Sequence, residues 1–272
     1  MVWGHSFRTT GATRDEKGTM IMDLNVDMGE SFGRYKLGND EEVMKYITSA
    51  NVACGFHAGD PLVMRQTVQL AAEYDVAVGA HTGLEDLRGF GRRRMDITPD
   101  ELRCDTLYQL GALDAVLKAS GMRMQHVKPH GILYRMVSDH ERYAAAYLDA
   151  VSLFNRELFI LIPRGTLIWQ RGVAEGFRMA AEILVDLSYD DEGNWVLERA
   201  KKARSPEEVA ERALMVAKDK KIPTISGKMI EAEADTICCH GDSPNAADVV
   251  SKVKEKLEQA GIPLRKISAS RD

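Results

Sequence analysis

The 272-residue sequence lacks the features that mark several large classes of protein. No apolar run approaches the roughly 20 residues that a helix needs to cross a bilayer, so we expect no membrane partner. An excess of basic residues is also missing, since the formal net charge is −5. A nucleic-acid-binding protein needs a basic face to meet phosphates, and we therefore expect no nucleic-acid partner.

Cysteine is scarce, and its spacing excludes a redox or zinc-ribbon pair. The four cysteines are Cys54, Cys104, Cys238 and Cys239, and none forms a C-x-x-C pair. We interpret all four as reduced thiols of a cytoplasmic protein. The N-terminal residues contain no apolar stretch of signal-peptide length, and we predict that residues 1–20 form a disordered extension.

Short motifs that specify a nucleotide or a metal site are absent as well. The chain contains no G-x-x-x-x-G-K-[ST] sequence, so a phosphate-binding loop of that kind is excluded. It contains no H-x-H pair, and its one H-x-x-x-H spacing, His126 to His130, ends a predicted strand and does not lie on a helix, so the spacing of its histidines does not specify a metal site.

What the sequence does contain is a regular alternation of buried strands and amphipathic helices. Seven short apolar runs read as parallel strands: Ile21–Asp27, Ser49–Cys54, Val76–His81, Met124–His130, Leu158–Pro163, Met179–Asp186 and Asp235–His240. Six helical patterns lie between or after them: Asp60–Asp75, Thr98–Ser120, Asp139–Phe154, Gly165–Gly176, Ser205–Asp219 and Asn245–Ala260. Tyr189–Arg204 reads as a polar loop, and Lys221–Ala234 as the place of an additional hairpin.

This alternation fits either a closed barrel or an open doubly wound sheet. Polar residues follow nearly every strand, and only in a barrel do all strand ends meet on one rim. These residues are Asp27, His57, His81, Lys128, His130, Asp186, His240 and Asp242. We therefore predict one α/β domain over residues 21–272, folded as a single seven-stranded β/α barrel.

Four of the seven histidines stand at the predicted rim, and one of them alone would be an ordinary structural residue. Convergence of histidines with carboxylates and a lysine is what general acid–base catalysis or a divalent metal requires. The candidate catalytic residues are Asp27, His57, His81, Lys128, His130 and His240. If a metal is bound, the candidate ligands are Asp27, His57 and His81.

Two glycine-containing loops could approach an anion. Asn51–Asp60 reads as a strand, a tight turn and a helix start, where free backbone amides can hold a carboxylate or phosphate. Gly89–Arg94 presents three arginines, and arginine binds such groups through two hydrogen bonds. Both segments also fit ordinary loops, the first a strand-to-helix turn and the second a solvated basic loop.

The motifs taken together resemble those of a known family. Asn25–Gly33 resembles an N-C-D-L-G-E-x-x-G opening, and Ser49–Pro61 resembles the block S-A-N-I-A-C-G-F-H-A-G-D-P. Four further matches follow in the same order: Gly79–Gly83, Gly89–Arg93, His126–Gly131 and Cys239–Asp242. From about residue 21 to 264 the chain is similar to the LamB/YcsF family, whose members include a component of 5-oxoprolinase.

The resemblance implies a barrel related to glycoside hydrolases and deacetylases. It also implies a cytoplasmic subunit of an ATP-dependent lactam hydrolase, which opens 5-oxoproline or a related small lactam with two partner subunits. ATP, with Mg²⁺, is the implied cofactor. The residues expected to bind substrate or phosphate are Asn25, Glu30, Asn51, Gly55, Gly89, Arg92, Arg93, Asp186 and Asp242.

The chain departs from the family pattern at three places. Val26 replaces a cysteine, and Thr82 and Leu84 fall within a block that reads H-P-G-Y in the family. Leu187 replaces the arginine of an E-x-F-A-D-R-x-Y stretch, of which Glu182, Asp186 and Tyr189 remain. Because an arginine there could anchor an anionic group, we expect a substrate other than 5-oxoproline, or one bound differently.

Two other functions remain open from the sequence. The first is a metal-dependent amidohydrolase or deacetylase, in which Asp27 and two histidines hold the ion. The second is a non-catalytic subunit that binds the substrate and presents it to a partner.

Overall fold

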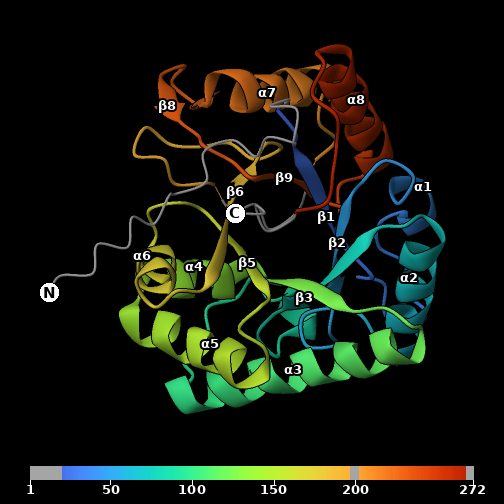
Figure 1. The fold of residues 1–272 in the computed structure, drawn as a ribbon, viewed down its shortest axis with the longest axis vertical. Coiled ribbons are helices and arrows are strands. Elements are labelled where there is room, and N and C mark those ends of the chain that lie inside the picture. The colour runs from blue at the N-terminus through green and yellow to red at the C-terminus, as the bar shows by residue number, and fades with distance from the viewer. Residues whose placement is uncertain (1–19, 197–201, 268–272) are drawn as a thin grey trace, which may run out of the picture.

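The computed structural model describes residues 20–196 and 202–267, and these fold around a closed barrel. Seven parallel strands follow the order β1-β2-β3-β4-β5-β6-β9 around the barrel, which Figure 1 shows with its surrounding helices. The predicted seven-stranded β/α barrel is therefore confirmed. The extension predicted for residues 1–20 lies outside the described residues, except for Met20.

The strands form where the sequence has short runs of buried residues. Their bounds are β1 Asp23–Met28, β2 Ser49–Ala53, β3 Ala77–Thr82, β4 Met124–Pro129, β5 Phe159–Ile162, β6 Arg178–Leu184 and β9 Thr236–Cys239. β1 closes the barrel by pairing with β2 on one side and β9 on the other, so that Asn25 lies opposite Ser49 and Cys238. The first and last strands of the barrel are thus neighbours.

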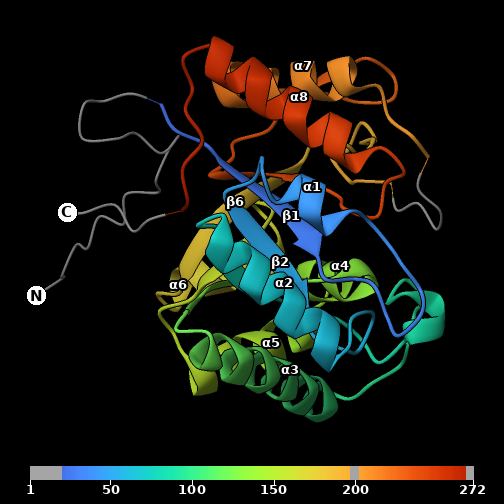
Figure 2. The ribbon, with the colours of Figure 1, turned by 90° about the vertical axis from the view of Figure 1, so that its right-hand side faces the viewer.

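Helices cover the outside of the barrel. They are α1 Asp40–Val43, α2 Pro61–Glu73, α3 Pro99–Ala119, α4 Gly131–Asp139, α5 Glu141–Phe154, α6 Leu167–Ala174, α7 Pro206–Asp219 and α8 Ala246–Gln259. Thr98 caps α3 in a reciprocal arrangement with Glu101, and Pro99 occupies its first turn, as the sequence indicates. Figure 2 shows α7 and α8 lying together at one end of the molecule, with α3 and α5 at the other.

One predicted helix was wrong in its bounds. The pattern Asp139–Phe154 is only the second of two helices, because α4 already begins at Gly131 and ends at Asp139. His140 between them is extended, with φ −133° and ψ 117°. The predicted strand ended at His130 and left residues 131–138 unassigned, although apolar residues recur there at helical spacing.

Other boundaries differ by one or two residues. β6 ends at Leu184, so that Asp186 follows the strand instead of ending it. The expected hairpin is present as β7 Lys221–Pro223 and β8 Met229–Glu231, which pair antiparallel outside the barrel. No helix within the ranges that the structure describes is long and apolar enough to cross a membrane.

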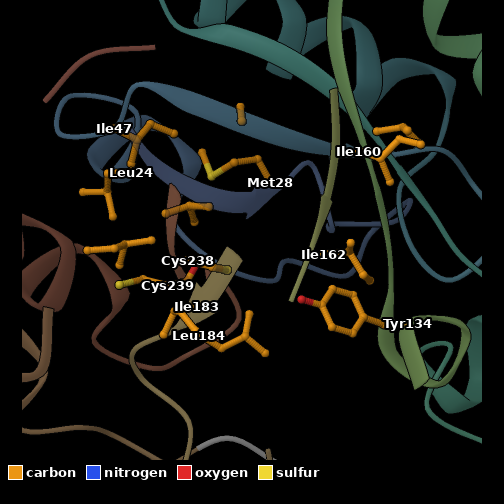
Figure 3. Close-up of a cluster of buried hydrophobic side chains, with 14 of the residues drawn as sticks. Leu24, Met28, Ile47, Tyr134, Ile160, Ile162, Ile183, Leu184, Cys238 and Cys239 are labelled. Carbon is orange, nitrogen blue, oxygen red and sulfur yellow. The ribbon is translucent and has the colours of Figure 1, made fainter. Parts of the chain in front are cut away.

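The alternation of side chains along the strands divides the molecule into an apolar outer shell and a polar barrel interior. On β1, Leu24 and Met28 belong to the hydrophobic core between strands and helices. Figure 3 shows this cluster, with Leu24, Met28 and Ile47 on one side and Tyr134 near Ile162 on the other. Asp23 and Asp27 point the opposite way, into the barrel, where hydrogen bonds satisfy them. The polar interior is what gives this barrel a site.

Candidate functional site

Buried polar side chains fill the barrel from its lower end to its mouth. Asp23, at the bottom, accepts hydrogen bonds from the hydroxyls of Ser49 (2.6 Å) and Thr236 (2.5 Å). In the middle layer the Asn51 amide donates to Asn25 Oδ1 at 2.7 Å. His126 lies in the same layer, with its Nε2 atom 2.8 Å from Asn51 Oδ1. These hydrogen-bonded layers support the groups above them.

Lys128, at the end of β4, is the centre of the upper layer. Its Nζ atom lies 2.9 Å from Asp27 Oδ1, 3.1 Å from Glu182 Oε1 and 3.0 Å from Cys238 Sγ. Burial alone would lower the pKa of Lys128, but Asp27, Cys238 and Glu182 together raise it well above its ordinary value. The ammonium is therefore a permanent positive charge at the base of the site, which suits it to stabilise anions and not to act as a base.

Asp27 connects Lys128 to the histidines. Burial opposes its charge, yet His81 and Lys128 hold the pKa of Asp27 well below its usual value. Its Oδ2 atom lies 3.4 Å from His81 Nε2 and 3.9 Å from His240 Nε2. Asp27 is thus an ionised carboxylate shared by one lysine and two histidines.

His240 is held by a carboxylate on its other side. Its Nδ1 atom lies 2.8 Å from Asp186 Oδ1, and its backbone N–H donates to Asp186 Oδ2 at 3.0 Å. A carboxylate can only accept, so Nδ1 carries the proton and Nε2 of the neutral ring is left as an acceptor. Asp186 and His240 therefore form an oriented pair whose free nitrogen faces Asp27.

Three histidines and Glu30 form a second group beside this one. The His57 and His130 rings stack with centroids 3.7 Å apart, and the His81 ring stands nearly perpendicular to both. Glu30 Oε1 lies 3.4 Å from His57 Nε2 and 3.8 Å from His130 Nδ1. Burial lowers the pKa of His57 and His130 well below the ordinary value and raises that of Glu30 well above it. All four side chains are buried.

The loop after β3 closes over these histidines. His130 Nε2 lies 2.8 Å from the carbonyl oxygen of Phe90, and Ile132 donates its backbone N–H to the carbonyl of Gly91 at 2.9 Å. Gly91 is required here, because a Cβ at this position would lie 2.7 Å from His130 Cδ2 and 2.8 Å from His57 Cβ. The glycine-rich segment therefore packs the backbone against the two stacked rings.

The arginines of this loop have different surroundings. Arg92 donates to Asp242 Oδ2 at 2.7 Å and lines the cavity at the barrel mouth. Arg93 pairs instead with Asp86, and 59% of its side chain is exposed. Gly89 lies in the short 3-10 turn Leu87–Gly89, away from the cavity lining. Arg92 is thus the member of this segment that reaches the site.

The cavity at the barrel mouth has a charged floor and an apolar wall. Asp27, His81, Lys128, His130 and His240 come from the ends of β1, β3, β4 and β9. The remaining lining residues are Arg92, Pro129, Gly131, Tyr134, Leu184, Leu187 and Trp195. This is an arrangement that can surround a small molecule with one polar end and one apolar side.

The structure brings five of the six candidate catalytic residues to this cavity. The sixth, His57, lies behind the lining, stacked on His130 and fully buried. Asn25 and Asn51 lie below the cavity, Glu30 lies beside His57, and Gly55 is in the β2–α2 loop with φ +91°. All lie at the barrel end where the strands terminate or in the layer beneath it.

Sequence reasoning missed several residues that complete the site. Tyr134 comes from the unpredicted helix α4, and its hydroxyl donates to Glu182 Oε2 at 2.7 Å. Cys238 contacts Lys128, although the sequence showed it only as a strand cysteine. Trp195 lies within Tyr189–Arg204, which the sequence indicates only as a polar loop. The spacing of Tyr134, four residues after His130 and therefore one helical turn on, was the one usable signal.

Two groups of side chains have the composition of metal ligands. One is Glu30, His57, His81 and His130, and the other is Asp27, Cys238 and His240. In the second group the Lys128 ammonium contacts both Asp27 and Cys238, so a cationic group already stands where an ion would be held. Of the ligand set predicted from the sequence, His57 and His81 are grouped with Glu30, and Asp27 is paired with Lys128.

Comparison with known proteins points to one family. The model of the LamB/YcsF family matches residues 22–272. A relative from Pyrococcus horikoshii, which is named as the A-type subunit of 5-oxoprolinase, is 48% identical over 90% of this chain and 97% of its own length. A crystal structure of a lactam utilization protein from Thermus thermophilus superposes with a TM-score of 0.82, at 40% identity, over 90% of this chain and 99% of that one.

A more distant likeness concerns the fold alone. The catalytic domain of a peptidoglycan N-acetylglucosamine deacetylase from Eubacterium rectale superposes with a TM-score of 0.50 at 11% identity. The alignment covers 97% of this chain and 95% of that domain. The expected relation to the deacetylase barrels therefore holds at the level of architecture.

Proposed function

The chain belongs to the LamB/YcsF family, and from that premise we propose that it is the component of an ATP-dependent lactam hydrolase that binds and opens the lactam. The substrate is 5-oxoproline or a small lactam related to it. The observation that carries the proposal is the cavity itself, in which an oriented histidine, a permanent cation and an apolar wall face one small space.

The reaction requires help because the lactam is a stable amide. Resonance makes its carbonyl carbon a poor electrophile, and transfer of a phosphoryl group from ATP to the carbonyl oxygen removes that resonance. Water then adds to the carbon, the C–N bond breaks, and the ring nitrogen takes a proton to become an amine. The acyl phosphate that is left is hydrolysed by a second water to the carboxylate and phosphate.

His240 suits the role of general base for the attacking water. Asp186 holds the proton on Nδ1, so Nε2 is free to accept a proton from water. The imidazolium that forms would be stabilised by Asp186 on one side and by Asp27, 3.9 Å from Nε2, on the other. The same nitrogen can afterwards return the proton to the leaving amine.

Lys128 supplies the charge that the transition state needs. Its ammonium is fixed by Asp27, Glu182 and Cys238 and lines the cavity, so no reorganisation is needed when negative charge develops on the lactam oxygen. Glu182 is itself held by the Tyr134 hydroxyl. These contacts make Lys128 a preorganised electrostatic stabiliser.

The apolar wall and Arg92 would orient the ring. Leu184, Leu187 and Trp195 offer a surface for ring methylene groups on the side opposite the histidines. Arg92 is the lining residue whose guanidinium could meet a substrate carboxylate, although it already pairs with Asp242. The binding mode thus differs from one with an arginine at position 187.

ATP use is assigned to the assembled enzyme with its two partner subunits. The proposal is supported by the name of the P. horikoshii relative, which designates one component of a larger enzyme, and by the lack of a phosphate-binding-loop motif in this sequence. Mg²⁺ would accompany the nucleotide. The isolated chain is accordingly expected to show little or no lactam cleavage.

The test is reconstitution of the enzyme from separately purified subunits, with glutamate and ADP measured together. We expect ATP-coupled glutamate formation only when this chain is present with its partners. A non-catalytic binding role predicts instead that substitutions at His240 weaken binding but leave turnover intact at saturating lactam. Efficient ATP-coupled cleavage by this chain alone would contradict the assignment of ATP to the complex.

A further inference from the structure

We propose that Glu30, His57, His81 and His130 form a closed binding site for one divalent ion of the zinc class, behind the wall of the cavity. The four residues come from the ends of β1 and β3 and the loops that follow β2 and β4. They are at most 6% exposed, and their ligand atoms lie within 4.8 Å of one another. Binding of the ion can be measured without the lactam, since only the four side chains and the ion take part in it.

The hydrogen-bond partners of His81 and His130 determine which nitrogen of each ring carries a proton. His81 Nδ1 faces the carbonyl oxygen of Lys128 at 3.1 Å, and His130 Nε2 faces the carbonyl oxygen of Phe90 at 2.8 Å. Carbonyl oxygens only accept, so each of these nitrogens carries a proton. The two remaining nitrogens, His81 Nε2 and His130 Nδ1, are then both lone-pair acceptors in the neutral rings.

These two acceptor nitrogens lie only 2.9 Å apart. Facing lone pairs at that separation repel unless a cation is held between or beside them, and the cation is either one additional proton or a metal ion. The carbonyl contacts on the far side of each ring are the outer-shell arrangement that orients metal-binding histidines. The geometry of the pair is therefore that of two oriented ligands.

His57 and Glu30 carry buried polar atoms that lack hydrogen bonds. Neither ring nitrogen of His57 has a hydrogen-bond partner among the described residues, and Glu30 Oε1 has none either. Unsatisfied buried polar atoms are costly, so three of them side by side need an explanation. A divalent ion bound by Glu30 Oε1 and one nitrogen of His57 satisfies two of the three and places a positive charge beside the carboxylate.

Distances among the four groups suit one ion. Ligand atoms about 2.0–2.2 Å from a tetrahedral ion lie about 3.3–3.6 Å apart. The separations here are 2.9 Å for His81–His130, 3.4 Å for His57–Glu30 and 3.8 Å for His130–Glu30. The stacked rings of His57 and His130 cannot both aim at one point, so His57 must turn, and no hydrogen bond of its ring to a described residue opposes the turn.

Glu30, and not Asp27, is the carboxylate of this site. Asp27 is 3.4 Å from His81, but its other oxygen already accepts from Lys128 and Asn51. Four protein ligands leave no open position, which is typical of a structural and not of a catalytic zinc site. The ion would fix the ring orientation of His81 and His130, both of which face the cavity.

The experiment measures metal directly. The full chain is produced without a polyhistidine tag, and its metal content is determined by elemental analysis. After chelation, Zn²⁺ and Co²⁺ are titrated back while heat unfolding and the visible Co²⁺ spectrum are recorded. We expect about one ion per chain, a tetrahedral Co²⁺ spectrum, and a rise in Tm of about 5 °C or more at 100-fold excess over Kd.

Variants locate the site. Glu30→Gln and His57→Gln should weaken the affinity for Zn²⁺ by more than about 100-fold, because even outer-shell substitutions cost about 10–100-fold. His126→Asn is the matched control, since His126 is equally buried in the barrel but both its nitrogens have partners, Gln125 and Asn51. That variant should bind zinc as the wild type does.

Two results would overturn the proposal. One is a folded wild-type chain that holds no metal and shows no thermal shift with millimolar Zn²⁺ or Co²⁺, which would assign the cation between His81 and His130 to a proton. The other is zinc binding that persists unchanged in both Glu30→Gln and His57→Gln. Because neither result involves turnover, both are separable from a failure of the lactam-hydrolase proposal.

Discussion

His240 and Asp186 are the residue pair on which the proposed chemistry depends most. Replacing His240 by Asn removes the base, and we expect kcat of the assembled enzyme to fall about 10²–10⁴-fold. Asp186→Asn should also lower kcat, because the amide no longer selects the Nδ1–H form of the ring. The measurement is the steady-state rate of glutamate formation, with the exposed His140→Asn variant as control. Unchanged kcat in His240→Asn would exclude His240 as the base.

Asp23, at the bottom of the barrel, should make the stability of the fold depend on pH, independently of the proposed active site. Burial raises the pKa of Asp23 to about 6, from its ordinary value of 3.8, against the lowering effect of its hydroxyl partners. The folded state therefore binds a proton that the unfolded state releases, and stability from this group is lost as pH rises from about 4 through 6. Two pKa units correspond to about 3 kcal/mol at most.

The Asp23→Asn variant isolates this effect. The free energy of unfolding of both proteins is measured in urea between pH 4 and 7.5. The difference between variant and wild type should rise in favour of the variant by about 2–3 kcal/mol from the lowest pH to the highest. The Asn side chain keeps the shape of Asp23 while the hydroxyls of Ser49 and Thr236 can reorient. Parallel pH profiles for the two proteins would mean that Asp23 stays ionised in the fold.

Substitution of Leu187 tests the identity of the substrate. It is buried in the cavity wall where the family pattern has an arginine. Leu187→Arg should lower the KM for 5-oxoproline by about 10–10³-fold, since a desolvated carboxylate gains a few kcal/mol from such a partner. Leu187→Met is the control of similar volume without charge. If the wild type already turns over 5-oxoproline efficiently and the arginine variant is no better, the altered-substrate interpretation is wrong.

The sequence predicts which residues gather at the mouth of the barrel. It does not predict which side chains contact one another there. Polar residues after strands mark the rim, because parallel strands of a barrel end together. The position of His57 behind His130 depends on how the loop after β2 turns, and the Lys128–Cys238 contact joins residues 110 apart in sequence. Such pairings follow from barrel register, which no local pattern contains.

Among the connecting elements, the loop between β2 and α2 depends on a glycine. Gly59 has φ +77°, and a Cβ there would lie 2.8 Å from the Gly29 carbonyl oxygen. We expect Gly59→Ala to lower the free energy of unfolding by about 2–3 kcal/mol, from left-handed strain plus the clash. Gly121→Ala, with φ +69° and no atom within 4 Å of the added Cβ, should cost only about 1 kcal/mol. Equal losses in urea unfolding would show that the clash relaxes freely.

The strands and long helices were predictable because their periodicity and caps are local. Thr98 and Pro99 specify the start of α3, and the buried run of β1 is visible directly. Helix α4 was missed because it begins immediately after β4, with Gly131 at φ +53° in its first turn. That conformation is set by the approach of the Gly91 backbone and not by the helix sequence.

At the level of the whole molecule, the barrel carries its polar residues inward and its apolar residues outward toward the helices. This inversion leaves Asp27, Lys128 and His240 at one end, supported from below by Asn25, Asn51 and other buried polar groups. We place the lactam there, with its carbonyl beside Lys128 and within reach of His240.

A crystal of this chain soaked with saturating 5-oxoproline tests that placement most directly. We predict an ordered lactam in the cavity, with its ring against Leu187 and Trp195 and its carbonyl carbon on the His240 side. An ordered lactam elsewhere on the molecule, or a cavity that stays free of lactam while the compound binds in solution, would contradict the proposed placement.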